Sequence, residues 1–90
     1  MYRSLDLVRS FRRDINNLRF SNEHYVKYIV YLSKLLSKEP LPPEALDHAL
    51  KGEWQDFREF HISGDLLVIY RIDGDIIRLT RIGTHSELFG

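Results

Sequence analysis

The 90-residue sequence contains no cysteine and no apolar run that approaches the roughly 20 residues needed to cross a bilayer. Without thiols the chain cannot form disulfides, iron–sulfur clusters or thiolate zinc fingers. Residues 1–6 show none of the apolar character of a secretory signal. Glycine-rich phosphate loops and serine or cysteine nucleophile motifs are also absent. We therefore expect one cytoplasmic domain over residues 1–90, with no cofactor and no membrane contact.

Charge is balanced over the whole chain but not along it. Residues 1–38 carry eight basic and three acidic side chains, whereas residues 39–90 carry five basic and ten acidic ones. An excess of positive charge in one half favours a polyanionic partner. A solvated helical face is the alternative that charge alone leaves open.

Hydrophobic spacing predicts two helices followed by a run of strands. Apolar residues recur every three or four positions after residue 8 and again after a Ser21 or Asn22 cap. Prolines at 40, 42 and 43 end the second helix, and Asp73-Gly74 is typical of a type I′ hairpin turn. The expected elements are a short strand over 2–7, helices over 8–18 and from 21 to the prolines, a helical turn over 43–46, strands over 54–62, 66–72 and 76–82, and a short tail over 83–90.

This order, β-α-α-β-β-β, predicts an α+β fold. The last three strands form an antiparallel meander, and the first strand is a candidate fourth member of the sheet. The two consecutive helices are expected to form an antiparallel hairpin packed on one face of the sheet.

Ionisable residues gather where this meander would place them together. Alternation in the strand 54–62 puts Glu59 and His61 on one face. Asp65 follows in the turn, while Arg81 and His85 lie at and beyond the end of the third strand. Because these points fall near one end of the sheet, we expect the side chains to converge.

A base, an acid and a phosphate clamp are the parts required for metal-free RNA cleavage. The base takes the proton of a 2′-hydroxyl that attacks the adjacent phosphorus, and the acid protonates the leaving 5′-oxygen. Histidine titrates near neutrality, and arginine matches phosphate oxygens. The alternative for Glu59 is a cross-strand ion pair with Arg58 or Arg81. No metal is expected, because the histidines at 48, 61 and 85 lack a local ligand pair.

The second half of the chain carries a specific combination of short motifs. They are an Asp-His pair at 47–48, Gly-x-Trp at 52–54 and Arg-x-Gly-Thr-His-x-x-Leu-Phe at 81–89. Together they resemble the YafQ-type toxins of the RelE superfamily, in detail over about residues 45–90 and in layout alone before that. One departure is Leu66, where the family often has a tryptophan, and it leaves the base contact and the codon preference open.

The resemblance implies a RelE-like fold and a ribosome-dependent, metal-independent endoribonuclease toxin. Such toxins cleave mRNA in the ribosomal A site and are neutralised by a cognate antitoxin that wraps them with a C-terminal segment. By analogy His85 or His61 transfers protons, Arg81 holds the scissile phosphate and Phe89 stacks on a nucleotide. The family positions implicated in cleavage match His48, Glu59, His61, Asp65, Arg81, His85 and Phe89. Contacts to ribosomal RNA are expected from Arg9, Arg12, Arg13, Lys27 and Lys34.

Two other functions fit the same layout. A ParE-like relative would inhibit a topoisomerase by binding it and would not need His85 or Phe89. A degenerate member would act only as an inactive antitoxin-binding module. Expression in bacteria distinguishes the three functions by whether growth stops and by whether translation or DNA replication stops first.

Overall fold

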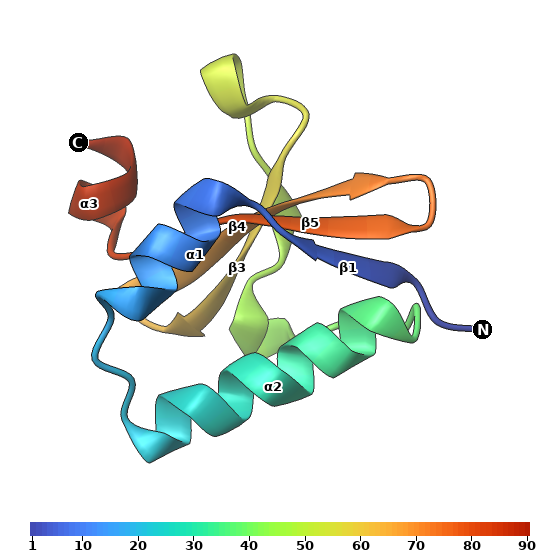
Figure 1. The fold of residues 1–90 in the computed structure, drawn as a ribbon, viewed down its shortest axis with the longest axis horizontal. Helices are drawn as coiled ribbons and strands as arrows, with labels where there is room; N and C mark the ends of the chain where they lie inside the picture. Colours follow the sequence, from blue (N-terminus) through green and yellow to red (C-terminus); the bar gives the residue numbers. More distant parts are fainter.

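The computed structural model describes residues 1–90, which form a five-stranded sheet with helices at one face and at one edge (Figure 1). The elements in chain order are β1 (Ser4–Leu7), α1 (Arg9–Asn16), α2 (Asn22–Leu36), the 3₁₀ turn η1 (Pro43–Ala45), β2 (His48–Ala49), the 3₁₀ turn η2 (Gly52–Trp54), β3 (Arg58–Ser63), β4 (Leu66–Asp73), β5 (Ile76–Gly83) and α3 (His85–Phe89).

The strands lie in the order β1-β5-β4-β3-β2. The last three strands form the predicted antiparallel meander, β1 joins it parallel to β5, and β2 adds a short antiparallel edge to β3. The α+β prediction is therefore confirmed, and the first strand does belong to the sheet. None of the helices combines the length and the apolar composition that a membrane span needs.

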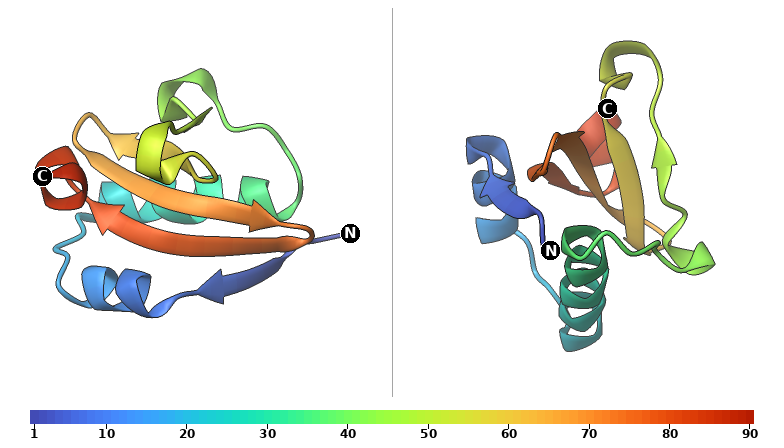
Figure 2. Two further views of the ribbon diagram at one scale, coloured as in Figure 1. Left: turned by 90° about the horizontal axis from the view of Figure 1, so that it is seen from above. Right: turned by 90° about the vertical axis from the view of Figure 1, so that its right-hand side faces the viewer.

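Helix α2 covers one face of the sheet (Figure 2). It begins where the sequence predicts, with the Ser21 hydroxyl accepting a hydrogen bond from the backbone N–H of His24, and it ends before the prolines. Its buried side chains, among them Tyr31, pack against the core face of the strands, where Tyr31 meets Phe60 edge to face at 5.9 Å. Burial of each such side chain stabilises the fold by roughly 1.5–3 kcal/mol.

Helix α1 lies along the edge of β5 and runs opposite to α2 (Figure 1). Its single buried residue, Phe11, stacks on Tyr28 of α2 with ring centroids 6.3 Å apart. This contact joins the two helices predicted to form a hairpin. A core of buried residues from both helices and the sheet thus holds the three together.

The first strand and the two helices are shorter than predicted, at Ser4–Leu7, Arg9–Asn16 and Asn22–Leu36, and the second half of the chain shows three larger differences. The strand expected over 54–62 begins only at Arg58, because η2 and a turn occupy the residues before it. The predicted type I′ turn at Asp73-Gly74 is wrong by one residue: the loop is Gly74-Asp75, and only Gly74 has a positive φ, as a type II′ turn requires. The expected tail over 83–90 contains the helix α3.

Candidate active site

The face of the sheet opposite α2 carries the ionisable residues. Cross-strand partners point to the same face, and the register aligns His48 with Glu59, Glu59 with Ile69, and Ile69 with Arg81. His61 lies two residues along from Glu59 on the same face. A small apolar cluster lies on the same face as these ionisable residues. In it Leu67, Ile69 and Leu88 are buried, and Leu50, Trp54 and Phe57 pack against them.

Glu59 and His61 form a buried pair at the centre of this face. The Glu59 carboxylate is only 5% exposed, and its Oε2 accepts a hydrogen bond from His61 Nε2 at 2.8 Å. His48 Nε2 approaches the same oxygen at 3.4 Å from β2. The cross-strand ion pair with an arginine that the sequence allowed for Glu59 is therefore not formed. The carboxylate instead orients the His61 imidazole and lies beside that of His48.

The three imidazole rings follow one another across the site. The ring centroid of His61 lies 6.3 Å from that of His48 and 5.5 Å from that of His85. The outer rings are open to solvent, with side-chain exposures of 53% for His48 and 50% for His85, whereas His61 is 10% exposed. Only the two outer rings can therefore reach a large ligand such as RNA without rearrangement.

His85 is held at the first position of α3 by Asp65. The Asp65 Oδ1 accepts hydrogen bonds from the His85 backbone N–H at 3.2 Å and from its ring Nδ1 at 3.3 Å. These bonds, the backbone one first, lower the pKa of the Asp65 carboxyl below its ordinary value. A capping box between Thr84 and Glu87 starts the helix. The structure thus brings His61, Asp65 and His85 to one end of the sheet.

Gly83 permits this close approach of α3 to the strand end. A Cβ at this position would lie 3.1 Å from Glu87 Oε1 and 3.3 Å from Leu88 Cδ2. The glycine in the Gly-Thr-His run therefore favours the close packing of α3, because a Cβ here would require Glu87 or Leu88 to shift by a few tenths of an ångström.

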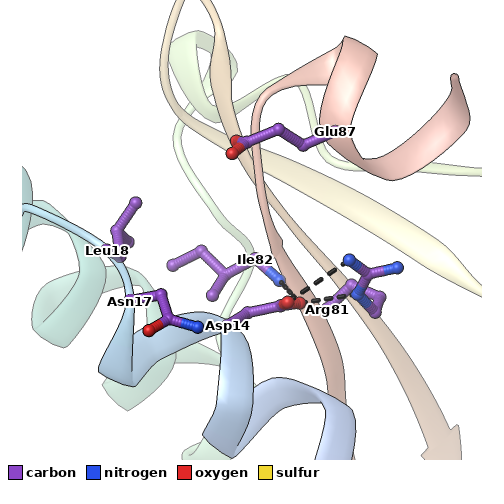
Figure 3. Close-up of a pocket in the computed structure, with 6 residues that line it drawn as sticks. All are labelled: Asp14, Asn17, Leu18, Arg81, Ile82 and Glu87. Carbon is purple, nitrogen blue, oxygen red and sulfur yellow. Dashed lines mark hydrogen bonds and ion pairs between the residues drawn. The ribbon is translucent and has the colours of Figure 1, made fainter.

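Arg81 lies in the same row but is turned toward α1. Its guanidinium forms a two-point contact with Asp14, Nε to Oδ2 at 2.6 Å and Nη2 to Oδ1 at 3.2 Å (Figure 3). A cavity of about 160 Å³ opens beside this pair. The sequence did not single out Asp14, which lies 67 residues from Arg81 along the chain.

Phe89 stands at the rim of the site and is 41% exposed. Its ring meets Trp54 edge to face at 6.0 Å and lies 6.1 Å from the ring of His85. One side of the ring is thus supported by Trp54, while a substantial part stays open.

A second group of contacts, which the sequence did not predict, holds Asp47, the residue before His48. On the core side of the sheet, the hydroxyl of the buried Tyr70 donates to Asp47 Oδ1 at 2.5 Å, and Arg58 Nε donates to the same oxygen at 3.4 Å. Burial, followed by the bond to Asp47, raises the pKa of Tyr70. Since β2 has only two residues, this anchor at the residue before His48 fixes the strand.

The arrangement also contains a set of atoms able to hold a metal ion. Glu59, His61 and His85 each offer one ligand atom, and these atoms lie within 4.8 Å of one another. Two imidazoles and a carboxylate suit Zn²⁺ or Cu²⁺. The sequence did not indicate this set, because its members come from two distant segments.

Comparison with known proteins gives consistent matches over nearly the whole chain. The family model described as "Bacterial toxin of type II toxin-antitoxin system, YafQ" matches residues 3–90. The mRNA interferase toxin YafQ of Escherichia coli strain K12 is 32% identical over 90 residues, which is 98% of this chain and 86% of that protein.

Solved structures agree with the sequence matches. A copper-bound mutant toxin from Helicobacter pylori is 42% identical and superposes with a TM-score of 0.81 over 97% of this chain and 99% of that chain. In the DinJ–YafQ toxin–antitoxin complex of E. coli, the matching chain is 27% identical, with a TM-score of 0.85 and full coverage of both chains. The fold seen in these structures is RelE-like.

Proposed function

The chain belongs to the YafQ family of type II toxins and is an endoribonuclease of the mRNA interferase kind, and we propose that it cleaves mRNA on the ribosome by metal-independent acid–base chemistry. The observation that carries the proposal is the pair of exposed imidazoles, His48 and His85, on either side of the buried Glu59–His61 pair. We propose that residues 1–90 form a single toxin domain and that this domain acts in the cytoplasm.

In this mechanism the two exposed histidines share the proton transfers. One imidazole takes the 2′-hydroxyl proton, O2′ attacks the adjacent phosphorus, and the other imidazole protonates the departing O5′. The products are a 2′,3′-cyclic phosphate and a 5′-hydroxyl end. Each proton transfer contributes about 10²–10⁴-fold to the rate.

The inner pair supports these histidines. The Glu59 carboxylate accepts a hydrogen bond from His61 and lies 3.4 Å from His48 Nε2, so it orients the inner ring and faces the outer one. The Asp65 carboxylate accepts from a ring nitrogen of His85 and holds that ring in orientation. We therefore assign Glu59, His61 and Asp65 to orienting and charge-stabilising roles.

Arg81 and Phe89 would bind the RNA itself. A guanidinium is suited to the extra negative charge on the phosphorus in the transition state. The exposed face of Phe89 can stack on a nucleotide base, and Trp54 keeps the ring in place. Stacking of this kind is worth about 1–3 kcal/mol per base.

We propose two macromolecular partners beside mRNA. The E. coli YafQ chain in the matching structure is bound to the antitoxin DinJ, and we expect a cognate antitoxin to neutralise this chain in the same way. Ribosomal RNA would be met by the basic side chains of α1, since Arg9, Arg12 and Arg13 are all exposed.

The chemistry of the donor set supports the proposed metal independence. A cation held by Glu59, His61 and His85 would occupy a ring nitrogen needed for proton transfer. A metal at this position would therefore oppose the mechanism and not assist it.

Expression of the chain in bacteria tests the proposal. We expect growth arrest with an early stop in translation, and loss of arrest in His85→Ala and Arg81→Ala. His24→Ala on α2, a histidine away from the site, serves as the matched control and should stay toxic. Folding of each variant is checked by circular dichroism.

Each alternative function predicts a different result. Toxicity that survives both His85→Ala and Arg81→Ala in folded proteins would contradict the nuclease proposal. An early stop in DNA replication with continued translation would favour the ParE-like function. Absence of any growth arrest from the parent chain would favour an inactive antitoxin-binding module.

A further inference from the structure

A bulge in β5 decides which way Arg81 points. Tyr70 pairs with Leu79 and Ile69 pairs with Arg81, so Thr80 is left without a partner on β4. Leu79 is buried in the main core. With regular alternation Arg81 would point into the core beside it, but the extra residue shifts it to the opposite face.

Helix α1 secures this bulge at the edge of the sheet. The pairing of β1 with β5 ends at Leu79, and α1 then takes over that edge. The Ser10 hydroxyl donates to the carbonyl oxygen of Thr80 at 2.6 Å. The Asp14 carboxylate accepts from the backbone N–H of Ile82 at 3.2 Å. Two side chains of α1 thus make the backbone hydrogen bonds that a neighbouring strand would make, one to the residue before Arg81 and one to the residue after it.

The same Asp14 carboxylate fixes the guanidinium. It accepts from Arg81 Nε and Nη2 and is itself only 11% exposed. This two-point contact uses one edge of the planar fork and prevents its rotation. Arg81 Nη1 makes no hydrogen bond within the protein, so that edge remains for a ligand.

We infer that Asp14 is a positioning residue for RNA cleavage, which holds the Arg81 guanidinium with its Nη1 edge ready for the scissile phosphate. This inference rests on the proposed function, because it assigns a partner to the arginine of that site. Asp14 does not touch RNA in this account and acts only through Arg81.

A double-mutant cycle tests this dependence. We expect Asp14→Asn, which keeps the size of the side chain and an acceptor for the Ile82 N–H, to lower kcat about 10- to 100-fold with a smaller change in KM. The measurement is mRNA cleavage on programmed ribosomes. In an Arg81→Ala background, Asp14→Asn should cause no further loss, since its only route to the phosphate has been removed.

Asp6→Asn is the matched control. It breaks another aspartate–arginine pair on the same edge of the sheet, with Arg78 of β5, at a distance from the site. We expect this variant to retain the parental kcat. An equal loss in both variants would mean that edge pairing in general, and not the hold on Arg81, supports activity.

An activity-independent readout covers the case in which Asp14 variants do not fold. In the parent protein the Arg81 Nε–H should give a slowly exchanging, downfield NMR signal, because it donates to Asp14. A rapidly exchanging Nε–H signal would overturn the inference, as would additive losses in the double mutant or a gain of activity in Asp14→Asn. A parent that cleaves no RNA contradicts the proposed function instead, and the NMR result still decides whether Asp14 holds Arg81.

Discussion

Replacing Tyr70 with phenylalanine removes one oxygen atom from the core and should loosen His48. The Tyr70 hydroxyl donates to Asp47 Oδ1, and hydrogen bonds to charged groups contribute about 1.5–3 kcal/mol. In this variant the Asp47 carboxylate still has Arg58 as a partner and is 23% exposed, so it is not left buried without a hydrogen bond. We therefore expect the lower part of that range, about 1.5–2 kcal/mol of unfolding free energy.

For a chain of this size, such a loss lowers Tm by about 6–16 °C. Thermal unfolding followed by circular dichroism measures it. Tyr28→Phe is the matched control, because the Tyr28 ring is also buried but its hydroxyl makes no hydrogen bond within the protein. That variant should change the unfolding free energy by less than about 0.5 kcal/mol.

The consequence for activity follows from the length of β2. Only two residues pair this strand with β3, so the anchor at Asp47 helps to keep His48 beside Glu59, together with the contact of His48 Nδ1 with the Leu46 carbonyl oxygen. We expect Tyr70→Phe to reduce cleavage by no more than His48→Ala does, and to add nothing in a His48→Ala background. Equal Tm and equal activity for Tyr70→Phe and Tyr28→Phe would show that the bond from Tyr70 to Asp47 neither stabilises the fold nor holds His48.

Three further predictions concern the open face. Phe89→Ala should raise KM for mRNA about 5- to 100-fold and leave antitoxin binding unchanged, measured by ribosomal cleavage and by calorimetry; an unchanged KM would argue against stacking. Micromolar Zn²⁺ or Cu²⁺ should inhibit cleavage through Glu59, His61 and His85, and chelator should not reduce the activity of metal-free protein; activation by either ion would contradict the metal-independent mechanism. The Asp65 carboxyl should titrate below about 3.9 by ¹³C NMR, and still do so in His85→Ala because the backbone N–H is its main partner. Since the folded-state pKa is the lower one, this contact stabilises the fold above about pH 4 and is lost as the pH falls through the folded-state value; an ordinary carboxyl pKa would show that the contact is absent in solution.

Local signals in the sequence were sufficient for much of the fold. The Ser21 cap placed the start of α2 correctly, and alternation placed Glu59 and His61 on one face. The helix ends at Leu36, earlier than the prolines alone predict, because Lys38 has a positive φ. The helix α3 was missed although its Thr84-x-x-Glu87 capping box stands in the sequence. Two-residue β2 carries too little pattern to be recognised.

The candidate site was accessible only in part, for a physical reason. Asp65 lies in the turn between β3 and β4, and His85 follows the end of β5. An antiparallel meander places both points at the same end of the sheet, so the pattern of strands alone brings the two residues together. The partner of Arg81 depends on a single-residue bulge and on the docking of α1, and neither leaves a periodic signal. Long-range side-chain contacts of this kind require the tertiary structure.

Ribosomes programmed with an mRNA whose scissile nucleotide lacks its 2′-hydroxyl test the proposed attack by O2′ directly. If His48 and His85 transfer protons in an attack by O2′, the unmodified mRNA is cut to a 2′,3′-cyclic phosphate and the 2′-deoxy mRNA is not cut. Cleavage of the 2′-deoxy mRNA at the same position and rate would contradict the account.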